Sequence, residues 1–383
     1  MAMSRFSIVL IGCCSCSQGL LSSERLQQTV VYGEDGRREY YEAADPLVQE
    51  RFSRSSVALI ANSYLEGSAP RISASAPTWS AKADVCPDEV FADQPAPAFC
   101  SGVLLDWDLV LTSGHCVRLL ALADFSIAFG FYYTEPGKLA FDAGDQVRPV
   151  EILAEALDPA GAEPRLDFAW LRLERPLSSR FRPAPFYSMR PLLHENDPLI
   201  TIGAPGGVPL KVDSSGTIAE VRKQGDFFIA RTDTSTGWSG GAAYDADMVL
   251  TGILSRGALD LIDSHEGCRV AVHPPAAAVA AEQFTYGAQA LLALCKAEPS
   301  RAICAPDCGD ICQAPAKLEV PAESRALVAA GGCSFSPRVQ HGPFSVFVWV
   351  LVGACTARQA ARRRLRLTRA LQRLCSGARH GRH

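Results

Sequence analysis

The chain has 383 residues, a net charge of −4 and an apolar fraction of 48%, so a sizeable core can form and wholesale disorder is excluded. Residues 338–383 contain ten arginines and no acidic residue, which leaves 27 basic and 41 acidic residues, or −14, elsewhere. This acidic body argues against a nucleic-acid partner. The 14 cysteines, none in paired C-x-x-C zinc spacing, favour an oxidising compartment with disulfides.

Residues 1–12 predict an export signal. Arg5 precedes a short apolar run, Phe6 to Ile11, and a small residue, Gly12, follows it. The ending Leu-Ile-Gly-Cys resembles a bacterial lipoprotein box, in which Cys13 becomes the lipidated first residue. An ordinary signal peptide is the alternative.

Residues 13–85 predict an N-terminal segment or pro-region that contains a polar turn, a short helix and an apolar strand. From Cys86 onward, short apolar segments alternate with turn residues such as "DWD", "APGG" and "DSSG". Many short strands at this spacing predict an all-β barrel or sandwich within residues 86–293. The segments are Val103–Leu105, Leu109–Thr112, Phe125–Tyr133, Phe168–Leu173, Leu199–Gly203, Phe227–Arg231, Met248–Leu254 and Arg269–Val272.

The end of this domain predicts a closing amphipathic helix over residues 276–296. A Cys-rich segment follows at 294–312, whose four cysteines allow two disulfides without fixing their pairing. Residues 313–341 predict a linker.

The last part of the chain combines a small-residue element with Cys333, an apolar helix at 342–357 and an Arg-rich tail at 358–383. This arrangement resembles the sorting tails of myxobacterial surface proteins, in which a cysteine ahead of the helix is processed, here Cys333. The apolar run is shorter than the roughly 20 residues that span a bilayer comfortably. A basic amphipathic helix lying on a membrane or a partner is the alternative.

Three short motifs within the β region carry chemistry. "LTSGHC" places His115 directly after an apolar strand and beside Cys116. A strand, a tight turn and a return strand bring Cys100 opposite Cys116, within disulfide reach. Asp167 begins another apolar strand, where a carboxylate needs a hydrogen-bond partner such as a histidine.

The third motif, "GWSGG", holds Ser239 two residues after Gly237. In acyl transfer a tetrahedral oxyanion needs two convergent backbone N–H donors, and the glycine lets its own N–H and that of Ser239 converge. The pattern also fits the esterase motif G-x-S-x-G. However, "DTST" before Gly237 is no apolar strand, so the esterase elbow is rejected.

The order His115, Asp167, Ser239 and the segments "FCSGVLL", "LTSGHCV", "DFAWLRL", "GWSGG" and "GILSRG" resemble trypsin-like (chymotrypsin-fold) serine peptidases over residues 86–274. "IGAPGGVPLK" and "DFFIARTDTSTG" look similar to the secreted bacterial branch that includes glutamyl endopeptidases. The resemblance implies two six-stranded Greek-key β-barrels with a C-terminal helix. It implies a nucleophile at Ser239, a general base at His115, an orienting Asp167, and an oxyanion hole formed by the N–H groups of Gly237 and Ser239.

The resemblance also implies substrate-binding positions. Ser255 is expected beside Asp167, and Ser255 to Gly257 along the substrate backbone. Asp233 matches the base of the specificity pocket in trypsin and weakly favours a basic residue at P1, the residue whose carbonyl is attacked. Arg256 stands where an aromatic residue is common and has the charge to attract an acidic group. A strand-end cap is an equal alternative for Asp233.

Two departures from the family pattern bear on activity. Gly114 replaces the usual alanine before the histidine, and Trp238 replaces the usual Asp or Asn before the serine. Trp238 excludes activation through an internal ion pair at that position and raises the alternative of a catalytically impaired, protease-like surface binding protein.

We therefore expect an exported serine endopeptidase at the bacterial cell envelope or in the medium. Its partners are expected to be protein or peptide substrates and, through the terminal signals, a membrane. We expect a monomer with no metal and no cofactor.

Overall fold

The computed structural model describes residues 34–66, 71–142, 144–257, 260–272 and 282–305, and the backbone of 312–313. The predicted export signal, Cys13, Cys333, the apolar helix and the Arg-rich tail lie outside these residues. Within the described part of the chain, no helix has the length and apolar character to cross a membrane.

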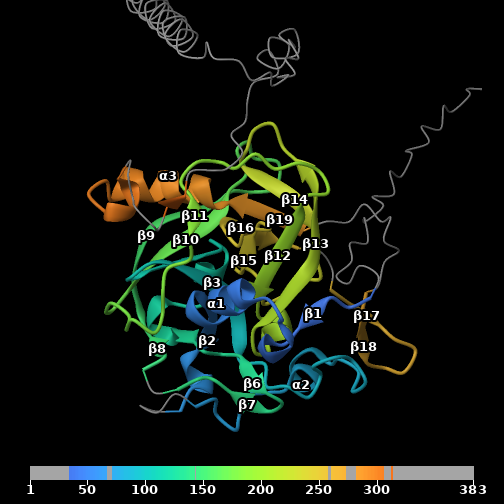
Figure 1. Ribbon diagram of the computed structural model, residues 1–383. Coiled ribbons are helices and arrows are strands. Elements are labelled where there is room, and N and C mark those ends of the chain that lie inside the picture. Colours follow the sequence, from blue (N-terminus) through green and yellow to red (C-terminus); the bar gives the residue numbers. More distant parts are fainter. Residues whose placement is uncertain are drawn as a thin grey trace, which may run out of the picture. The chain divides into compact units, whose positions relative to one another are not determined.

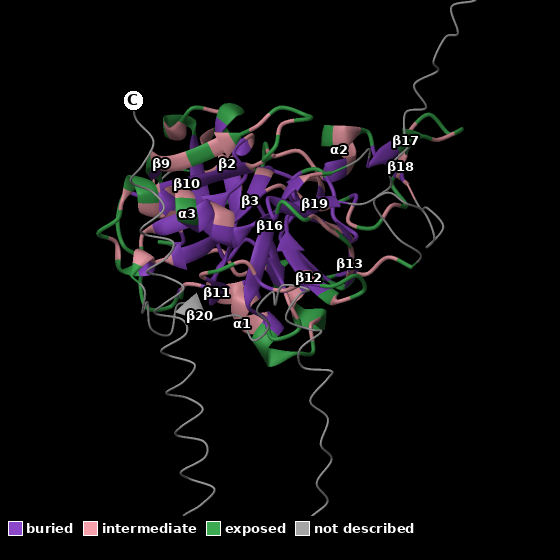
Figure 2. Ribbon diagram, turned by 90° about the horizontal axis from the view of Figure 1, so that it is seen from above, coloured by how far each residue is buried: buried purple, intermediate pink, exposed green. Residues whose placement is uncertain are grey.

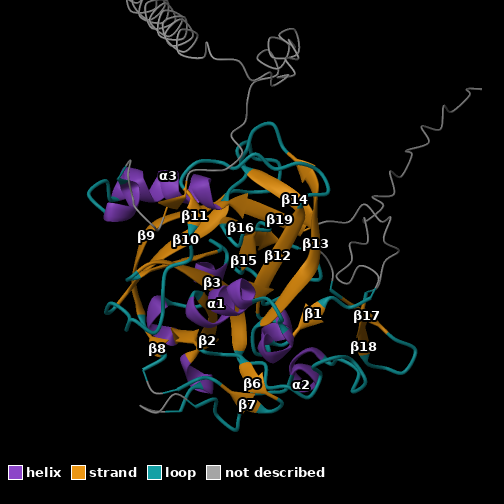
Figure 3. Ribbon diagram, in the orientation of Figure 1, coloured by secondary structure: helices purple, strands orange, loops and turns teal. Residues whose placement is uncertain are grey.

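Strands dominate the described residues and form two large, mainly antiparallel sheets (Figures 1 and 3). The first sheet is an open half-barrel in which hydrogen-bonded neighbours follow the order β8-β5-β2-β3-β4-β10-β9. Its strands are β2 (Ser56–Ala61), β3 (Ala98–Asp106), β4 (Leu109–Thr112), β5 (Phe125–Phe129), β8 (Gln146–Val147), β9 (Pro149–Leu157) and β10 (Asp167–Leu173). The interior strand β2 thus comes from the segment expected to precede the peptidase domain.

The second sheet contains a closed six-stranded barrel, because its path β15-β12-β13-β14-β19-β16 returns through a β15–β16 pairing. Closure leaves no unpaired strand edge in this ring. The strands are β12 (Pro198–Gly203), β13 (Lys211–Val221), β14 (Phe227–Arg231), β15 (Ala242–Tyr244), β16 (Leu250–Arg256) and β19 (Glu282–Tyr286). Three short strands extend this sheet beyond the ring: β1 (Arg37–Arg38) pairs with β13, β11 (Phe186–Tyr187) pairs with β16, and β20 (Cys312–Gln313) pairs with β11.

Helices are few and short within the residues that the structure describes. Asp45 caps α1 (Pro46–Arg54) by accepting from the N–H of Leu47, as expected for an N-cap aspartate. The others are α2 (Trp79–Ala83) and α3 (Gly287–Ala297), with 3₁₀ turns at Tyr40–Glu42, Asn62–Tyr64, Cys116–Arg118, Leu122–Asp124, Pro205–Gly207 and Ala302–Cys304. Two small hairpins complete the described elements: β6 (Tyr133–Glu135) with β7 (Lys138–Leu139), and β17 (Leu261–Asp263) with β18 (Arg269–Ala271).

The interior is formed by the strands of both sheets, while the exposed residues gather in loops and on outer helix faces (Figure 2). Helix α3 lies beside β9 and β10, and the indole of Trp170 on β10 donates to the carbonyl of Ala290 on α3 at 2.8 Å. A buried indole N–H needs such a partner. The helix therefore ties the C-terminal end of the domain to the first sheet.

The predicted strands and the Asp106–Asp108 turn agree with the structure, but two predictions are wrong. "DSSG" is no turn, since β13 runs through it; there Asp213 accepts hydrogen bonds from the N–H and hydroxyl of Ser215. The helix predicted over 276–296 begins only at Gly287, and β19 precedes it. The barrel closes through β19, so tertiary pairing overrides the helical pattern of the sequence.

Three disulfides crosslink the described residues: Cys86–Cys268, Cys100–Cys116 and Cys295–Cys304. Structural disulfides are typical of proteins that fold outside the reducing cytosol. The first one, which the sequence did not indicate, ties the segment after α2 to the β17–β18 hairpin.

Replacing Cys86 and Cys268 together with alanine is expected to lower the free energy of unfolding by roughly 2–5 kcal/mol, because the crosslink restricts the unfolded chain. The sequence separation is 182 for this pair and 9 for Cys295–Cys304, so the alanine variant of the second pair should lose less. Urea denaturation without reductant measures both. An equal or larger loss for the short loop would contradict this explanation.

Candidate active site

His115, Asp167 and Ser239 line one cavity of about 560 Å³. His115 follows β4 and Asp167 begins β10 in the first sheet, whereas Ser239 lies in the loop before β15 of the barrel. The cavity therefore opens where the two sheets meet. Its remaining lining residues are Leu157, Arg165, Phe227, Ile229, Ser255, Arg256, Gly257 and Gln283.

The imidazole of His115 is oriented by a buried carboxylate. Its Nδ1 lies 2.9 Å from Asp167 Oδ2, and the backbone N–H of His115 donates to Oδ1 of the same residue at 3.1 Å. The Asp167 side chain is 1% exposed, so these bonds offset its loss of hydration. With the proton on Nδ1, the second ring nitrogen, Nε2, is an acceptor, and the ring remains 33% exposed.

The loop that carries Ser239 requires glycine at position 237. Gly237 has a φ of +93°, and a Cβ there would lie 2.5 Å from the carbonyl oxygen of Ala204. The carbonyl of Thr236 accepts from the N–H of Gly206 at 2.7 Å. Because a trans peptide directs its C=O and N–H to opposite sides, the N–H of Gly237 points away from Gly206.

Ser101, which the sequence did not single out, holds the other side of this loop. Its hydroxyl donates to the carbonyl of Gly237 at 2.8 Å and its N–H donates to the carbonyl of Ser239 at 2.8 Å. Neither the N–H of Gly237 nor that of Ser239 donates a hydrogen bond within the described residues. Both donors therefore remain available to an oxyanion. A buried serine directly after Cys100 was the only signal in the sequence.

Asp260 also positions the loop that carries Ser239, a role that the sequence did not indicate. Its Oδ2 accepts from both the N–H and the hydroxyl of Thr236, the residue before Gly237. Burial raises the pKa of Asp260, while the hydrogen bonds from Thr236 and the charges of Arg37 and Arg269 oppose that shift.

Trp238 lies inside the barrel. Its side chain is fully buried among residues such as Leu199 and Phe228. A Cβ on Gly203 would collide with its indole, and one on Gly241 would lie 2.6 Å from Cδ1. The absence of side chains at these two glycines makes room for Trp238, and its bulk occupies the barrel core.

The loop of His115 is fixed from both sheets. The hydroxyl of Ser113 donates to the carbonyl of Leu254 on β16 at 2.6 Å. A Cβ on Gly114 would collide with the carbonyl oxygen of Ala156 on β9, which explains glycine at this position.

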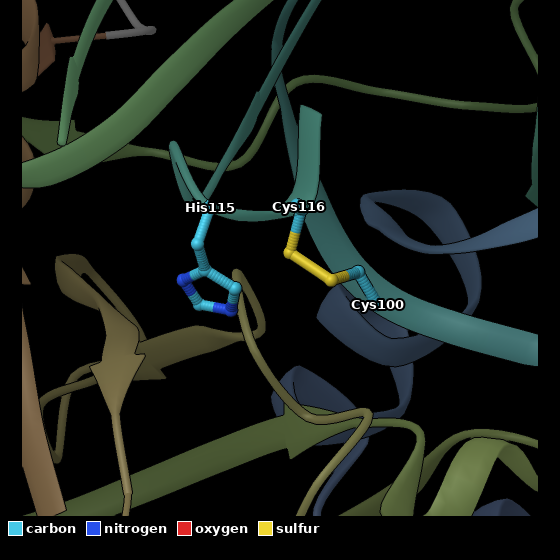
Figure 4. Close-up of side chains that lie close together, drawn as sticks. All are labelled: Cys100, His115 and Cys116. Atoms are coloured by element: carbon cyan, nitrogen blue, oxygen red, sulfur yellow. A yellow bond between two sulfur atoms is a disulfide. The ribbon is translucent and has the colours of Figure 1, made fainter. Parts of the chain in front are cut away.

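The Cys100–Cys116 disulfide anchors the same loop beside His115 (Figure 4). The ring of His115 and the two sulfur atoms lie within 4.8 Å of one another, a spacing that would suit a metal ion. Because the sulfurs are bonded to each other, they are not thiolate ligands.

The positions expected to bind substrate separate into two places. Ser255, Arg256 and Gly257 line the cavity, and the hydroxyl of Ser255 donates to the carbonyl of Gln283 at 2.9 Å. Arg256 also lies beside the Asp167 carboxylate, with its Nε 3.6 Å from Oδ2. Asp233 does not line this cavity: it is buried, and its Oδ2 accepts from the N–H of Gly36 at 2.6 Å.

Residues 100–253, which include His115, Asp167 and Ser239, match the family model of the trypsin-like peptidase domain. No curated protein matches the chain.

Among solved structures, a Glu endopeptidase in complex with MPD is 16% identical with a TM-score of 0.43, covering 71% of this chain and 100% of its own. The inactive form of a mutant of Rv3671c from M. tuberculosis is 15% identical with a TM-score of 0.38, covering 67% and 93%. Kallikrein-related peptidase 10 is 19% identical with a TM-score of 0.35, covering 53% and 91%. The family match over residues 100–253 is thus to trypsin-like peptidase domains, and the described structure is mostly β, with a closed barrel beside a half-barrel.

Proposed function

We propose that the protein is a serine endopeptidase that hydrolyses peptide bonds through His115, Asp167 and Ser239. The observation that carries the proposal is the 2.9 Å contact between His115 Nδ1 and the buried Asp167, in a cavity that also contains Ser239. The match of residues 100–253 to trypsin-like peptidase domains supports the reaction class.

In the proposed reaction, Ser239 Oγ attacks the carbonyl carbon of the substrate while His115 Nε2 accepts the hydroxyl proton. The electron pair of the carbonyl moves to its oxygen, and the N–H groups of Gly237 and Ser239 stabilise the resulting oxyanion. Asp167 keeps the imidazole in the productive tautomer and stabilises its charged form.

Collapse of this intermediate expels the amine, which takes its proton from His115, and leaves an acyl ester on Ser239. Water then attacks the ester with His115 again accepting a proton. A second oxyanion collapses, Ser239 recovers its proton and the carboxylic acid leaves. The two products together contain the substrate and one water.

We further propose that the enzyme acts outside the cytoplasm. The three disulfides support this compartment. Lipidation at Cys13, processing at Cys333 and a monomeric state remain predictions from the sequence.

Digestion of an unbiased peptide library by the purified protein tests the proposal, with cleaved bonds identified by mass spectrometry. We expect cuts within peptides rather than only at their ends, and an activity abolished by a fluorophosphonate. A folded protein that cuts no member of the library would refute the proposed function.

A further inference from the structure

Two arginines line the wall of the catalytic cavity. Arg165 lies in the loop just before β10, and Arg256 is the last residue of β16. Four of the residues that line the cavity have ionisable side chains: these two arginines, His115 and Asp167. A cavity with two permanent cations and one carboxylate favours an anionic occupant.

Arg256 is held in place. Its Nη2 donates to the carbonyl oxygen of Asp158 at 2.5 Å, and its Nε lies 3.6 Å from Asp167 Oδ2. The Asp167 carboxylate is therefore shared between the histidine and this guanidinium.

Arg165 lacks such partners. Its guanidinium makes no hydrogen bond or ion pair within the described residues, and its Nε is buried. Burial, together with the like charges of Arg256 and Arg222, lowers the pKa of Arg165, while Asp167 and Asp226 act in the opposite direction. Asp226 already accepts from the backbone N–H of Arg165 at 2.9 Å. The guanidinium is partly buried, and its covered Nε has no partner, so it carries a desolvation cost that a carboxylate can offset.

The position of the two arginines relative to His115 Nε2 indicates which residue of the substrate reaches them. Asp167 Oδ2 contacts both Arg256 and Nδ1 of His115, and Nε2 lies on the opposite edge of the imidazole. The guanidinium of Arg256 therefore lies on the side of the ring away from the proposed proton transfer. A side chain that reaches it belongs to a neighbour of the residue whose carbonyl is attacked.

The acyl side of a substrate is expected to run along Ser255 to Gly257, and Arg256 is the middle residue of this edge. We propose, on the basis of the proposed peptidase function, that Arg165 and Arg256 form a subsite for an acidic side chain at P2, the residue that precedes P1 in the substrate. Arg165 supplies a guanidinium whose planar donors match a carboxylate, and Arg256 adds charge next to it.

Three matched peptides with Glu, Gln or Lys at P2 and an identical remainder test the proposal, with P1 taken from the library result. A second set varies P1 in the same way. For the wild-type protein we expect kcat/KM to be about tenfold higher for Glu than for Gln at P2, lowest for Lys, with the difference shrinking as ionic strength rises.

Arg165→Gln is expected to abolish the preference for Glu over Gln at P2, mainly through KM. Arg165→Lys should retain part of the preference that Arg165→Gln loses, since lysine keeps the positive charge but lacks the planar donors of a guanidinium. Arg222→Gln is the matched control. It removes a nearby cation that pairs with Glu163 and Asp226 and does not line the cavity, so the preference should persist.

Titration of active sites with a fluorophosphonate, together with thermal unfolding, verifies that each variant is folded and competent. Equal kcat/KM for Glu and Gln at P2, an acidic preference confined to P1, or a preference that Arg165→Gln leaves intact would overturn the subsite. If the titrated wild-type protein cuts no peptide, the proposed peptidase function fails first, and the subsite fails with it.

Discussion

Replacing Ser239 with alanine is expected to lower kcat/KM by about 10⁶-fold, the scale at which removal of a serine nucleophile abolishes acyl-enzyme formation. Ser239 is half-buried and lines the cavity together with His115, so the change removes the proposed nucleophile with little loss of packing. Cleavage of the best library peptide by the two proteins measures the effect.

Ser235 provides the matched control, because it lies in the same loop and also carries a buried hydroxyl. Ser235→Ala should keep kcat/KM within severalfold of the wild-type value. Residues that act as a unit are not additive, so His115→Ala with Ser239→Ala should be no worse than Ser239→Ala alone. A Ser239→Ala protein that retains a tenth of the activity would exclude this residue as the nucleophile.

Replacing Gly237 with alanine is expected to lower kcat by about 10²–10³-fold, the usual cost of losing one oxyanion donor. A Cβ at this position meets the carbonyl oxygen of Ala204 at 2.5 Å and the amide nitrogen of Gly207 at 2.8 Å. The backbone must rotate to relieve these contacts, and that rotation redirects the Gly237 N–H. KM should change less than kcat, since the oxyanion forms only during the reaction.

Gly267→Ala is the control that distinguishes the effect of backbone strain from the loss of the Gly237 N–H donor. Gly267 also has a positive φ, +84°, but nothing lies within 4 Å of the added Cβ. We expect a stability loss of about 1 kcal/mol from the unfavourable φ and an unchanged kcat. If Gly237→Ala kept full kcat, the oxyanion assignment would be wrong.

Much of the candidate site could be predicted from the sequence, because each residue lies in a short motif with its own chemical requirement. His115 follows an apolar strand, Asp167 begins one, and Ser239 lies between glycines. Strands β4, β10 and β14 could be predicted for a similar reason, since each is a short apolar segment between turn residues.

The remaining features depend on distant parts of the chain. The bulk of Trp238 next to Ser239 suggested impaired activity. In the structure the indole of Trp238 fills the space left by Gly203, which lies on another strand of the barrel. The ion pair between Arg256 and Asp167 likewise joins residues of the two sheets. Such contacts depend on barrel closure, which no local pattern encodes.

Arg165 illustrates a second limit. Only one residue, Leu166, separates it from Asp167 in the chain, but an arginine in a polar loop carries no signal that its side chain is partly covered. Its proposed role in substrate binding can be recognised only from the structure, in which Arg256, from the other sheet, lines the same cavity. The proposed specificity, more than the candidate triad, therefore required the structure.

Covalent labelling by a fluorophosphonate, mapped by mass spectrometry of the digested protein, tests the central claim most directly. The account predicts a single adduct on Ser239 in the folded wild-type protein, with no adduct after unfolding in urea and almost none in His115→Ala, because the imidazole must activate the hydroxyl. No adduct on the folded wild-type protein, or equal labelling of Ser239 in His115→Ala, would contradict it.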